Sequence, residues 1–158
     1  MSSTEPLGEV IFYRIEQAIK SYRQFAQKQL RAKGFRITID QWLVLKTLSE
    51  FPGITQSRLA VIVFKEEASI TRTLSLMEKQ KILKRGKTTD KRENALAITA
   101  KGRALLRDIL PVIRSNRTRA LAGIPAKAIR EADKVMRSIT GNCEPGKKRK
   151  KRNDVGQS

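Results

Sequence analysis

The stretch from residue 38 to residue 80 constrains the fold most, because its apolar residues recur at spacings of three and four, which places them on one face of a helix. The first helix should begin at Thr38, whose hydroxyl can accept from a backbone amide while Gln41 reaches back, the pattern of a capping box. Further helices are expected from Gln56 to about Val63 and from about Glu67 to Gln80. Two short helices joined by a tight turn, the second with a polar outer face, predict a helix-turn-helix; the alternative is an ordinary helical bundle.

Two short apolar segments follow, Ile82–Arg85 and Asn94–Ile98, and their pattern favours strands. Between them, residues 86–93 are polar and basic and begin with a turn-forming glycine. A β-hairpin that follows a helix-turn-helix is a wing, whose tip can lie along a sugar-phosphate backbone or enter a minor groove. Residues 54–103, which hold both features, contain twelve Lys or Arg and five Asp or Glu, so positive charge coincides with the predicted topology.

Long helical patterns flank this region on both sides. One runs from about Pro6 to Lys33, and another, from about Ala100 to Ala122, contains Pro111, which should kink it. A last helix is expected after Pro125. Since a long apolar stripe needs a partner along its whole length, and a small domain rarely supplies one, we expect a second copy of the chain to cover it.

The predicted fold class is therefore mainly α with a small β-hairpin wing, a winged helix-turn-helix with long terminal dimerisation helices. We expect an N-terminal dimerisation helix at residues 1–34 and a winged helix-turn-helix lobe at residues 35–99. C-terminal dimerisation helices should occupy residues 100–141, and a basic, disordered tail should occupy residues 142–158.

The charge balance points to a polyanionic partner. The chain has 34 Lys or Arg against 15 Asp or Glu, a formal net charge of +19. Residues 145–158 hold six bases and one acid, so residues 1–144 still carry +14. Phosphate binding is the commonest use of such an excess, and a basic surface that only faces solvent is the alternative.

Rare and absent residue types exclude several classes of protein. The chain has no His and a single cysteine, Cys143, so an internal disulfide, a zinc ribbon and a Ser-His or Cys-His dyad are ruled out. Carboxylates such as Asp40, Glu66 and Glu67 fall at capping or turn positions and no phosphate-binding loop is present, so we predict no enzyme, cofactor or metal.

The apolar runs are far shorter than the ~20 residues of a membrane span, and no secretory signal is evident. We therefore expect a cytoplasmic protein.

Short motifs occur in a fixed order along the chain. They are Thr38-x-x-Gln41-Trp42-x-x-Leu45-x-x-Leu48, Leu59-Ala60, Ser69-Ile70-Thr71-Arg72-x-Leu74-x-x-Met77-Glu78-Lys79, Ile82-Leu83-x-Arg85, Asp90-Lys91-Arg92 and Leu96-x-Ile98-Thr99-x-Lys101-Gly102. This order resembles the MarR (multiple antibiotic resistance regulator) family over roughly residues 7–140. The resemblance implies a homodimeric winged-helix transcription regulator, which we expect to be a repressor located in the bacterial cytoplasm and associated with the nucleoid. Its first and last two helices would interlace between subunits, and each subunit would present a recognition helix to a pseudo-palindromic double-stranded DNA operator.

The resemblance also implies which residues contact DNA. In the recognition helix these are Ala68, Ser69, Thr71, Arg72 and Ser75. In the wing they are Lys87, Thr88, Asp90, Lys91 and Arg92, with Arg92 in the minor groove and Asp90 holding the wing. Gln56, Ser57 and Arg58 could hold phosphate through backbone amides and charge. An Arg can grip a guanine edge or a phosphate, but the alternative for Arg72 is a surface ion pair with Glu78 or Asp90.

A small-molecule effector is a further implication of the resemblance. Family members commonly take a small aromatic or anionic molecule in a cleft between the dimer helices and the DNA-binding lobe. The candidates here are Tyr13, Tyr22, Arg23 and Trp42, although we expect Trp42 to serve mainly as core. One branch of the family senses peroxide through a Cys in the first helix, and that mechanism is excluded because Cys143 is the only cysteine.

A rival interpretation comes from a different class of protein. A non-specific nucleic-acid packaging or scaffold protein would also use the net charge and the basic run Lys147–Arg152. The two hypotheses differ in the ratio of specific to random DNA affinity, which is typically about 10³ or more for an operator-binding protein.

Overall fold

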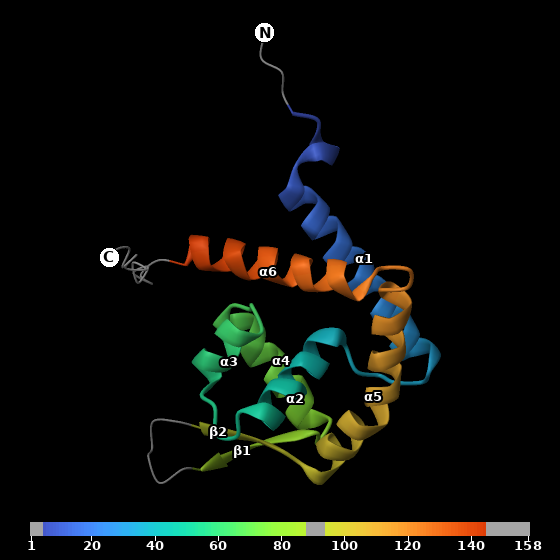
Figure 1. The fold of residues 1–158 in the computed structure, drawn as a ribbon. Coiled ribbons are helices and arrows are strands. Elements are labelled where there is room, and N and C mark those ends of the chain that lie inside the picture. The colour runs from blue at the N-terminus through green and yellow to red at the C-terminus, as the bar shows by residue number, and fades with distance from the viewer. Residues whose placement is uncertain (1–4, 88–93, 145–158) are drawn as a thin grey trace, which may run out of the picture. The chain divides into compact units, whose positions relative to one another are not determined.

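The computed structural model describes residues 5–87 and 94–144, which form a mainly helical fold with a two-stranded antiparallel sheet (Figure 1). The chain divides into two compact units, residues 1–120 and residues 121–158. The described elements of the first unit are a short 3-10 helix (Leu7–Glu9), α1 (Ile11–Ala32), α2 (Ile39–Glu50), α3 (Gln56–Ile62), α4 (Glu67–Lys79), β1 (Leu83–Lys87), β2 (Asn94–Ile98) and α5 (Ala100–Ala120). The second unit contains α6 (Ala126–Cys143). The predicted fold class is confirmed.

Several element boundaries differ from those predicted. The first helix is interrupted at Val10, whose backbone is extended (φ −72°, ψ 113°), so the 3-10 helix is separate from α1. In the first unit, α5 is one helix with Pro111 inside it, and it ends at Ala120 rather than at the predicted Ala122. α6 runs past Gly141, so residues 142 and 143 belong to the helix rather than to the tail, and Cys143 is its last residue. A glycine inside a helix costs only ~1 kcal/mol relative to alanine, which is too little to end an otherwise regular helix.

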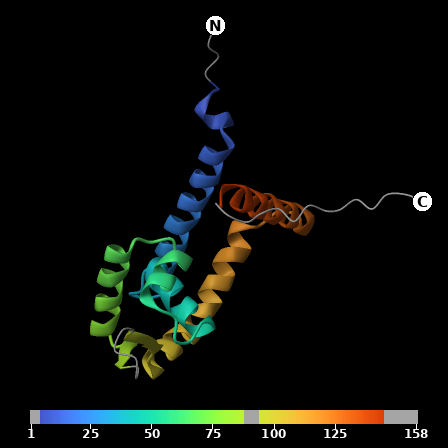
Figure 2. The ribbon, with the colours of Figure 1, turned by 90° about the vertical axis from the view of Figure 1, so that its left-hand side faces the viewer.

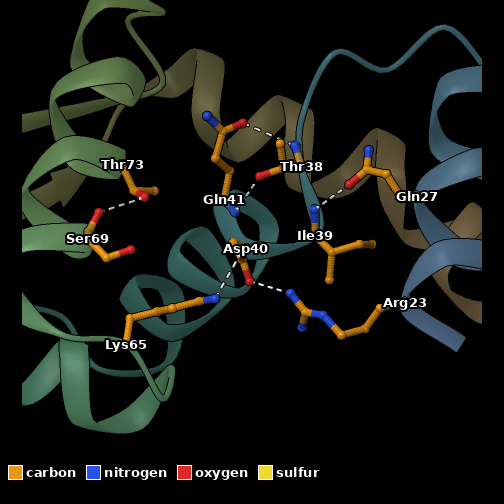
Figure 3. Close-up of polar contacts among 9 residues, drawn as sticks. All are labelled: Arg23, Gln27, Thr38, Ile39, Asp40, Gln41, Lys65, Ser69 and Thr73. Carbon is orange, nitrogen blue, oxygen red and sulfur yellow. Dashed lines mark hydrogen bonds and ion pairs between the residues drawn. The ribbon is translucent and has the colours of Figure 1, made fainter. Parts of the chain in front are cut away.

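The junction between α1 and α2 has the geometry that the sequence predicts. Gly34, just after α1, has φ +81°, a conformation that favours glycine because it has no Cβ. The backbone N of Gln41 donates to Thr38 Oγ1 at 3.1 Å, and the backbone N of Thr38 donates to Gln41 Oε1 at 3.1 Å (Figure 3). The capping box is therefore confirmed, and it fixes the start of α2.

The core of the first unit forms where the helices α1 to α5 meet the sheet. Its fully buried side chains include Leu30 of α1, Leu45 of α2, Leu59 of α3, Leu74 of α4 and Ile109 of α5. α1 and α5 lie side by side, as two views show (Figures 1 and 2). Each such aliphatic side chain contributes about 1.5–3 kcal/mol when it is fully buried. The apolar stripes of the sequence thus converge on one core that holds α4 from its inner face.

The first turn of α5 packs directly on the backbone that follows α4. Thr99 Oγ1 donates to the carbonyl oxygen of Lys81 at 2.7 Å and accepts from the backbone N of Gly102 at 3.1 Å. Lys101 Nζ donates to the carbonyl oxygen of Gln80 at 2.9 Å. A Cβ on Gly102 would lie 2.1 Å from the carbonyl oxygen of Ile82, so any larger residue would push α5 away. The motif Thr99-x-Lys101-Gly102 therefore joins α5 to the end of α4 and the start of β1.

We expect Gly102→Ala to destabilise the fold, because overpacking against a fixed backbone atom costs typically about 1–3 kcal/mol or more. The measurement is urea unfolding followed by circular dichroism. Gly141→Ala is the matched control, since Gly141 also lies in a helix but a Cβ added to it would meet no atom within 4 Å. The control should be neutral or slightly stabilising, and equal loss in both variants would contradict the packing account.

Candidate nucleic-acid interface

α4 has one buried face and one exposed polar face. Ile70, Leu74 and Met77 point into the core. The residues predicted to contact DNA from this helix are all exposed, and they are Ala68, Ser69, Thr71, Arg72 and Ser75. The turn before α4 reverses the chain at Phe64, whose φ of +57° is unusual for a residue with a side chain. α3, the turn and α4 thus form the helix-turn-helix that the sequence predicts.

The polar side chains on the exposed face of α4 differ in their hydrogen bonds. Thr71 Oγ1 donates to the carbonyl oxygen of Glu67 at 2.9 Å and accepts from Gln56 Nε2 at 2.7 Å. Ser75 Oγ donates to the carbonyl oxygen of Thr71 at 2.9 Å. Ser69 accepts through its backbone carbonyl from Thr73 Oγ1 (Figure 3), and its own hydroxyl makes no hydrogen bond within the described residues. Ser69 therefore keeps its full hydrogen-bonding capacity, whereas the hydroxyl of Thr71 is already engaged.

Arg72 projects from the exposed face of α4. Within the described part of the chain it forms neither an ion pair nor a side-chain hydrogen bond. The sequence suggested Glu78 as an alternative partner for Arg72, but Glu78 accepts from Arg85 Nε at 2.5 Å. The other partner, Asp90, lies outside the described residues. The guanidinium of Arg72 can thus reach a ligand without first breaking a contact with Glu78.

The start of α3 lies close to α4. Thr55 Oγ1 accepts from the backbone N of Arg58 at 3.2 Å, so the amide of Arg58 is occupied by the helix cap. The side chains of Ser57 and Arg58 are exposed. Gln56 is half-buried and is directed toward Thr71. Among the three residues predicted to hold phosphate, Ser57 and Arg58 face solvent and Gln56 faces the protein.

The strands of the wing pair over their whole length. Leu83 lies opposite Ile98, Arg85 opposite Leu96, and Lys87 opposite Asn94. Leu83 and Leu96 are buried and anchor the sheet on the core. The remaining wing residues of the prediction, which are Thr88, Asp90, Lys91 and Arg92, lie outside the described residues. The sheet therefore places the base of the wing directly after the end of α4.

A cavity of about 510 Å³ lies between α1 and the start of α2. Its lining is rich in cations and amides, and consists of Arg23, Gln24, Gln27, Lys28, Arg31, Thr38, Ile39 and Asp40. Asp40 forms an ion pair with Arg23, and its other oxygen lies 3.3 Å from Lys65 Nζ (Figure 3). Gln27 holds the backbone on both sides of Thr38, accepting from the N of Ile39 at 3.0 Å and donating to the carbonyl oxygen of Ile37 at 3.2 Å. One carboxylate thus links α1, α2 and the turn before α4.

Solved structures of other proteins share this fold. No protein-family model matches the sequence. A MarR family transcriptional regulator from Silicibacter pomeroyi has a TM-score of 0.77 at 17% identity, over 91% of this chain and 97% of that chain. A MarR family protein of Mycobacterium tuberculosis, solved with salicylic acid, has a TM-score of 0.64 at 23% identity, over 88% and 99%. Bordetella bronchiseptica BpsR, whose DNA binding is regulated by 6-hydroxynicotinic acid, has a TM-score of 0.76 at 15% identity, over 87% and 98%.

The chain has the MarR fold. The similarity extends over most of the molecule, because each alignment covers at least 87% of this chain. The order of the sequence motifs and the arrangement of the elements therefore agree on the same fold.

Only Arg23 of the four predicted effector residues lines the cavity between α1 and α2. Tyr13 lines a separate hollow of about 340 Å³ along α1. Tyr22 and Trp42 are half-buried and pack against the core, in keeping with the core role expected for Trp42. The MarR fold of this chain thus brings Arg23 together with Asp40 and Lys65 rather than with the three aromatic residues.

Sequence reasoning missed the pairing of Asp40 with Arg23 and Lys65 and the contacts of Gln56 with Thr71 and Arg85. These residues come from different elements of the MarR fold, so no local spacing could reveal the contacts. Within residues 5–87 and 94–144 no cluster of His, Cys, Asp or Glu could hold a metal ion. In the same ranges, no helix is long and apolar enough to cross a membrane.

The terminal helices of this MarR fold expose apolar side chains. In the first unit Ile11 is 56% exposed and Phe12 is 59% exposed, both at the start of α1. In the second unit Val135 of α6 is 51% exposed, and α6 buries none of its residues fully.

Also on α6, Arg137 Nε donates to Asp133 Oδ2 at 2.7 Å, and this hydrogen bond together with the carboxylate charge raises the pKa of Arg137.

Proposed function

We propose that this chain is a sequence-specific, double-stranded DNA-binding transcription regulator that acts as a homodimer on a pseudo-palindromic operator, most simply as a repressor. The observation that carries the proposal is the exposed polar face of α4, directly followed by a wing, in the fold of solved MarR family regulators. A helix with this exposure fits the major groove, and its Arg and Ser side chains can bond to base edges or phosphates. The function implies work in the bacterial cytoplasm, on the nucleoid.

The electrostatics support a polyanionic partner. The net charge of +19 attracts DNA from any direction and raises the rate of encounter. Ser57, Arg58 and Arg72 are exposed on the helix-turn-helix. Arg72 and Arg58 make no ion pair within the described residues, so DNA would not have to displace an internal carboxylate. We assign Arg72 and Ser69 to base or phosphate contacts, Arg58 to phosphate, and Arg92 with Lys87, Thr88 and Lys91 to the wing contact.

The exposed apolar residues support a homodimer. The start of α1 presents Ile11 and Phe12 to solvent, and α6 presents Val135 in its own unit. Contiguous apolar surface on a terminal helix is costly in water and marks a contact with another chain. A second copy is the simplest partner, since a twofold dimer would cover the same helix in both subunits and match the symmetry of an operator.

An anionic effector is part of the proposal, supported by the cavity beside Arg23. The lining cations Arg23, Lys28 and Arg31 outnumber the single carboxylate, Asp40. An anion that pairs with Arg23 would compete with Asp40, whose other contact is Lys65. Because Lys65 lies two residues before α4, release of this pair would shift the start of the recognition helix. Such a change would lower the affinity for the operator by altering the geometry of the dimer on DNA.

The first test is selection of bound fragments from random or genomic DNA, followed by footprinting. We expect an inverted pair of half-sites about one helical turn apart, because the dimer symmetry sets their spacing. Sedimentation equilibrium on the same sample should give twice the chain mass. A strictly monomeric chain, or protection without any sequence preference, would instead favour the packaging function.

The second test replaces the two arginines that we propose to contact the grooves of DNA. Arg72→Met should lower operator affinity by roughly 5- to 150-fold, with the loss concentrated at one base-pair position, since a base contact is worth about 1–3 kcal/mol. Arg92→Ala should weaken binding without unfolding the protein. The control is Arg107→Met, an exposed arginine on α5 that should change affinity little. Equal losses in all three variants would show a purely electrostatic surface.

The third test uses salicylate and 6-hydroxynicotinate as probes of the cavity. We expect at least one of them to reduce operator affinity, and Arg23→Gln to remove that response. Fluorescence anisotropy of labelled operator DNA measures both effects. Lys20→Gln is the control, because Lys20 lies on the same helix and pairs only with Glu16 in the described chain. An unchanged response in Arg23→Gln would contradict the assignment of this cavity.

A further inference from the structure

Four side chains connect α3, α4 and β1 beside the exposed face of the recognition helix. Gln56 Nε2 donates to Thr71 Oγ1 at 2.7 Å. Arg85 Nη1 donates to Gln56 Oε1 at 3.4 Å, and Arg85 Nε donates to Glu78 Oε1 at 2.5 Å. The four residues form one polar chain, Thr71–Gln56–Arg85–Glu78, which we call the α3–α4–β1 network.

The hydrogen bonds of the network orient Gln56 toward the protein. Its amide nitrogen is directed at Thr71 and its amide oxygen at Arg85, so both ends of the side chain are engaged. The hydroxyl of Thr71 is engaged twice, since it also donates to the carbonyl oxygen of Glu67. By contrast, Ser57 and Arg58 are exposed on the same turn of α3. Gln56 and Thr71 thus hold each other across the junction between α3 and α4.

The network spans two turns of α4. Thr71 and Glu78 are seven residues apart, which places them on one side of the helix about 10 Å from each other. Gln56 attaches the first position to α3, and Arg85 attaches the second to β1. The Glu78 and Arg85 side chains are 36% and 27% exposed, so water screens this ion pair only in part. The network therefore fixes α4 at two points against α3 and against the first strand of the wing.

We propose that Gln56 and Arg85 are positioning residues that set the orientation of the recognition helix relative to α3 and β1 and thereby the selectivity for the operator. The inference rests on the proposed DNA-binding function. Base contacts require atoms to be placed within a fraction of an ångström, whereas attraction to phosphate does not. Loss of the network therefore changes the affinity for the operator and leaves the affinity for random DNA unchanged.

The experiment compares Gln56→Met, Thr71→Val and the double variant on operator and random DNA at one salt concentration. Both substitutions keep the side-chain volume and remove the hydrogen bond between the two residues. We expect each single variant to lower operator affinity about ten-fold and to leave random-DNA affinity within about two-fold. The double variant should lose no more than Gln56→Met alone, because that change already breaks the contact that Thr71→Val removes. Thr71→Ser, which keeps the hydroxyl, should restore the operator affinity.

Arg58→Met is the matched control, because it removes an exposed cation from the same helix. It should weaken operator and random DNA alike and reduce the salt dependence of binding. If Gln56→Met behaves like Arg58→Met on both DNAs, or if the losses of Gln56→Met and Thr71→Val add in full, the residues contact DNA directly and the positioning role is refuted.

The same experiment separates this inference from the proposed function. If the unsubstituted chain shows no operator preference, the DNA-binding function itself fails. If it prefers the operator and Gln56→Met retains the full preference, only the positioning role fails. Thermal unfolding of each variant identifies loss of fold, and Gln56→Met, which also breaks the Gln56–Thr71 hydrogen bond, carries the test should Thr71→Val prove unstable.

Discussion

The contact between the first turn of α5 and the backbone after α4 determines how the parts of the first unit fit together. Gly102 allows α5 to approach the carbonyl oxygen of Ile82, and Thr99 bonds to Lys81 at the same place. The end of α4, the first strand of the wing and the start of the long helix α5 therefore meet at one place. α5 also lies along α1, where Arg119 Nη1 donates to Gln29 Oε1 at 3.2 Å, so the positions of α4 and β1 are connected to a terminal helix.

α4 is held by two different kinds of interaction. Its inner face depends on apolar burial, which is strong but has no preferred direction, so it fixes the depth of the helix in the lobe. Its flank depends on hydrogen bonds from Gln56 and Arg85, which are weaker but directional and can fix rotation and tilt. The residues that bury the inner face of α4 and those that hold its flank are separate in this chain.

Much of the fold could be predicted from the sequence because local rules govern it. The capping box at Thr38 and Gln41, the apolar stripe of α4 and the alternation in the wing strands each involve residues close together in the chain. The end of α6 was missed because Gly141 interrupts the pattern without ending the helix. The partners of Asp40 and Gln56 could not be predicted, since they depend on how three elements pack. Of the proposed DNA contacts, sequence indicated the exposed face of α4 but not that the Thr71 hydroxyl is already bonded.

Asp40 is shared by Arg23 and Lys65, so one anion balances two cations from distant parts of the chain. All three side chains are about one-third exposed, and dissolved ions can therefore reach and screen both pairs together. Rising ionic strength should therefore loosen the connection that Asp40 makes between α1 and the turn before α4.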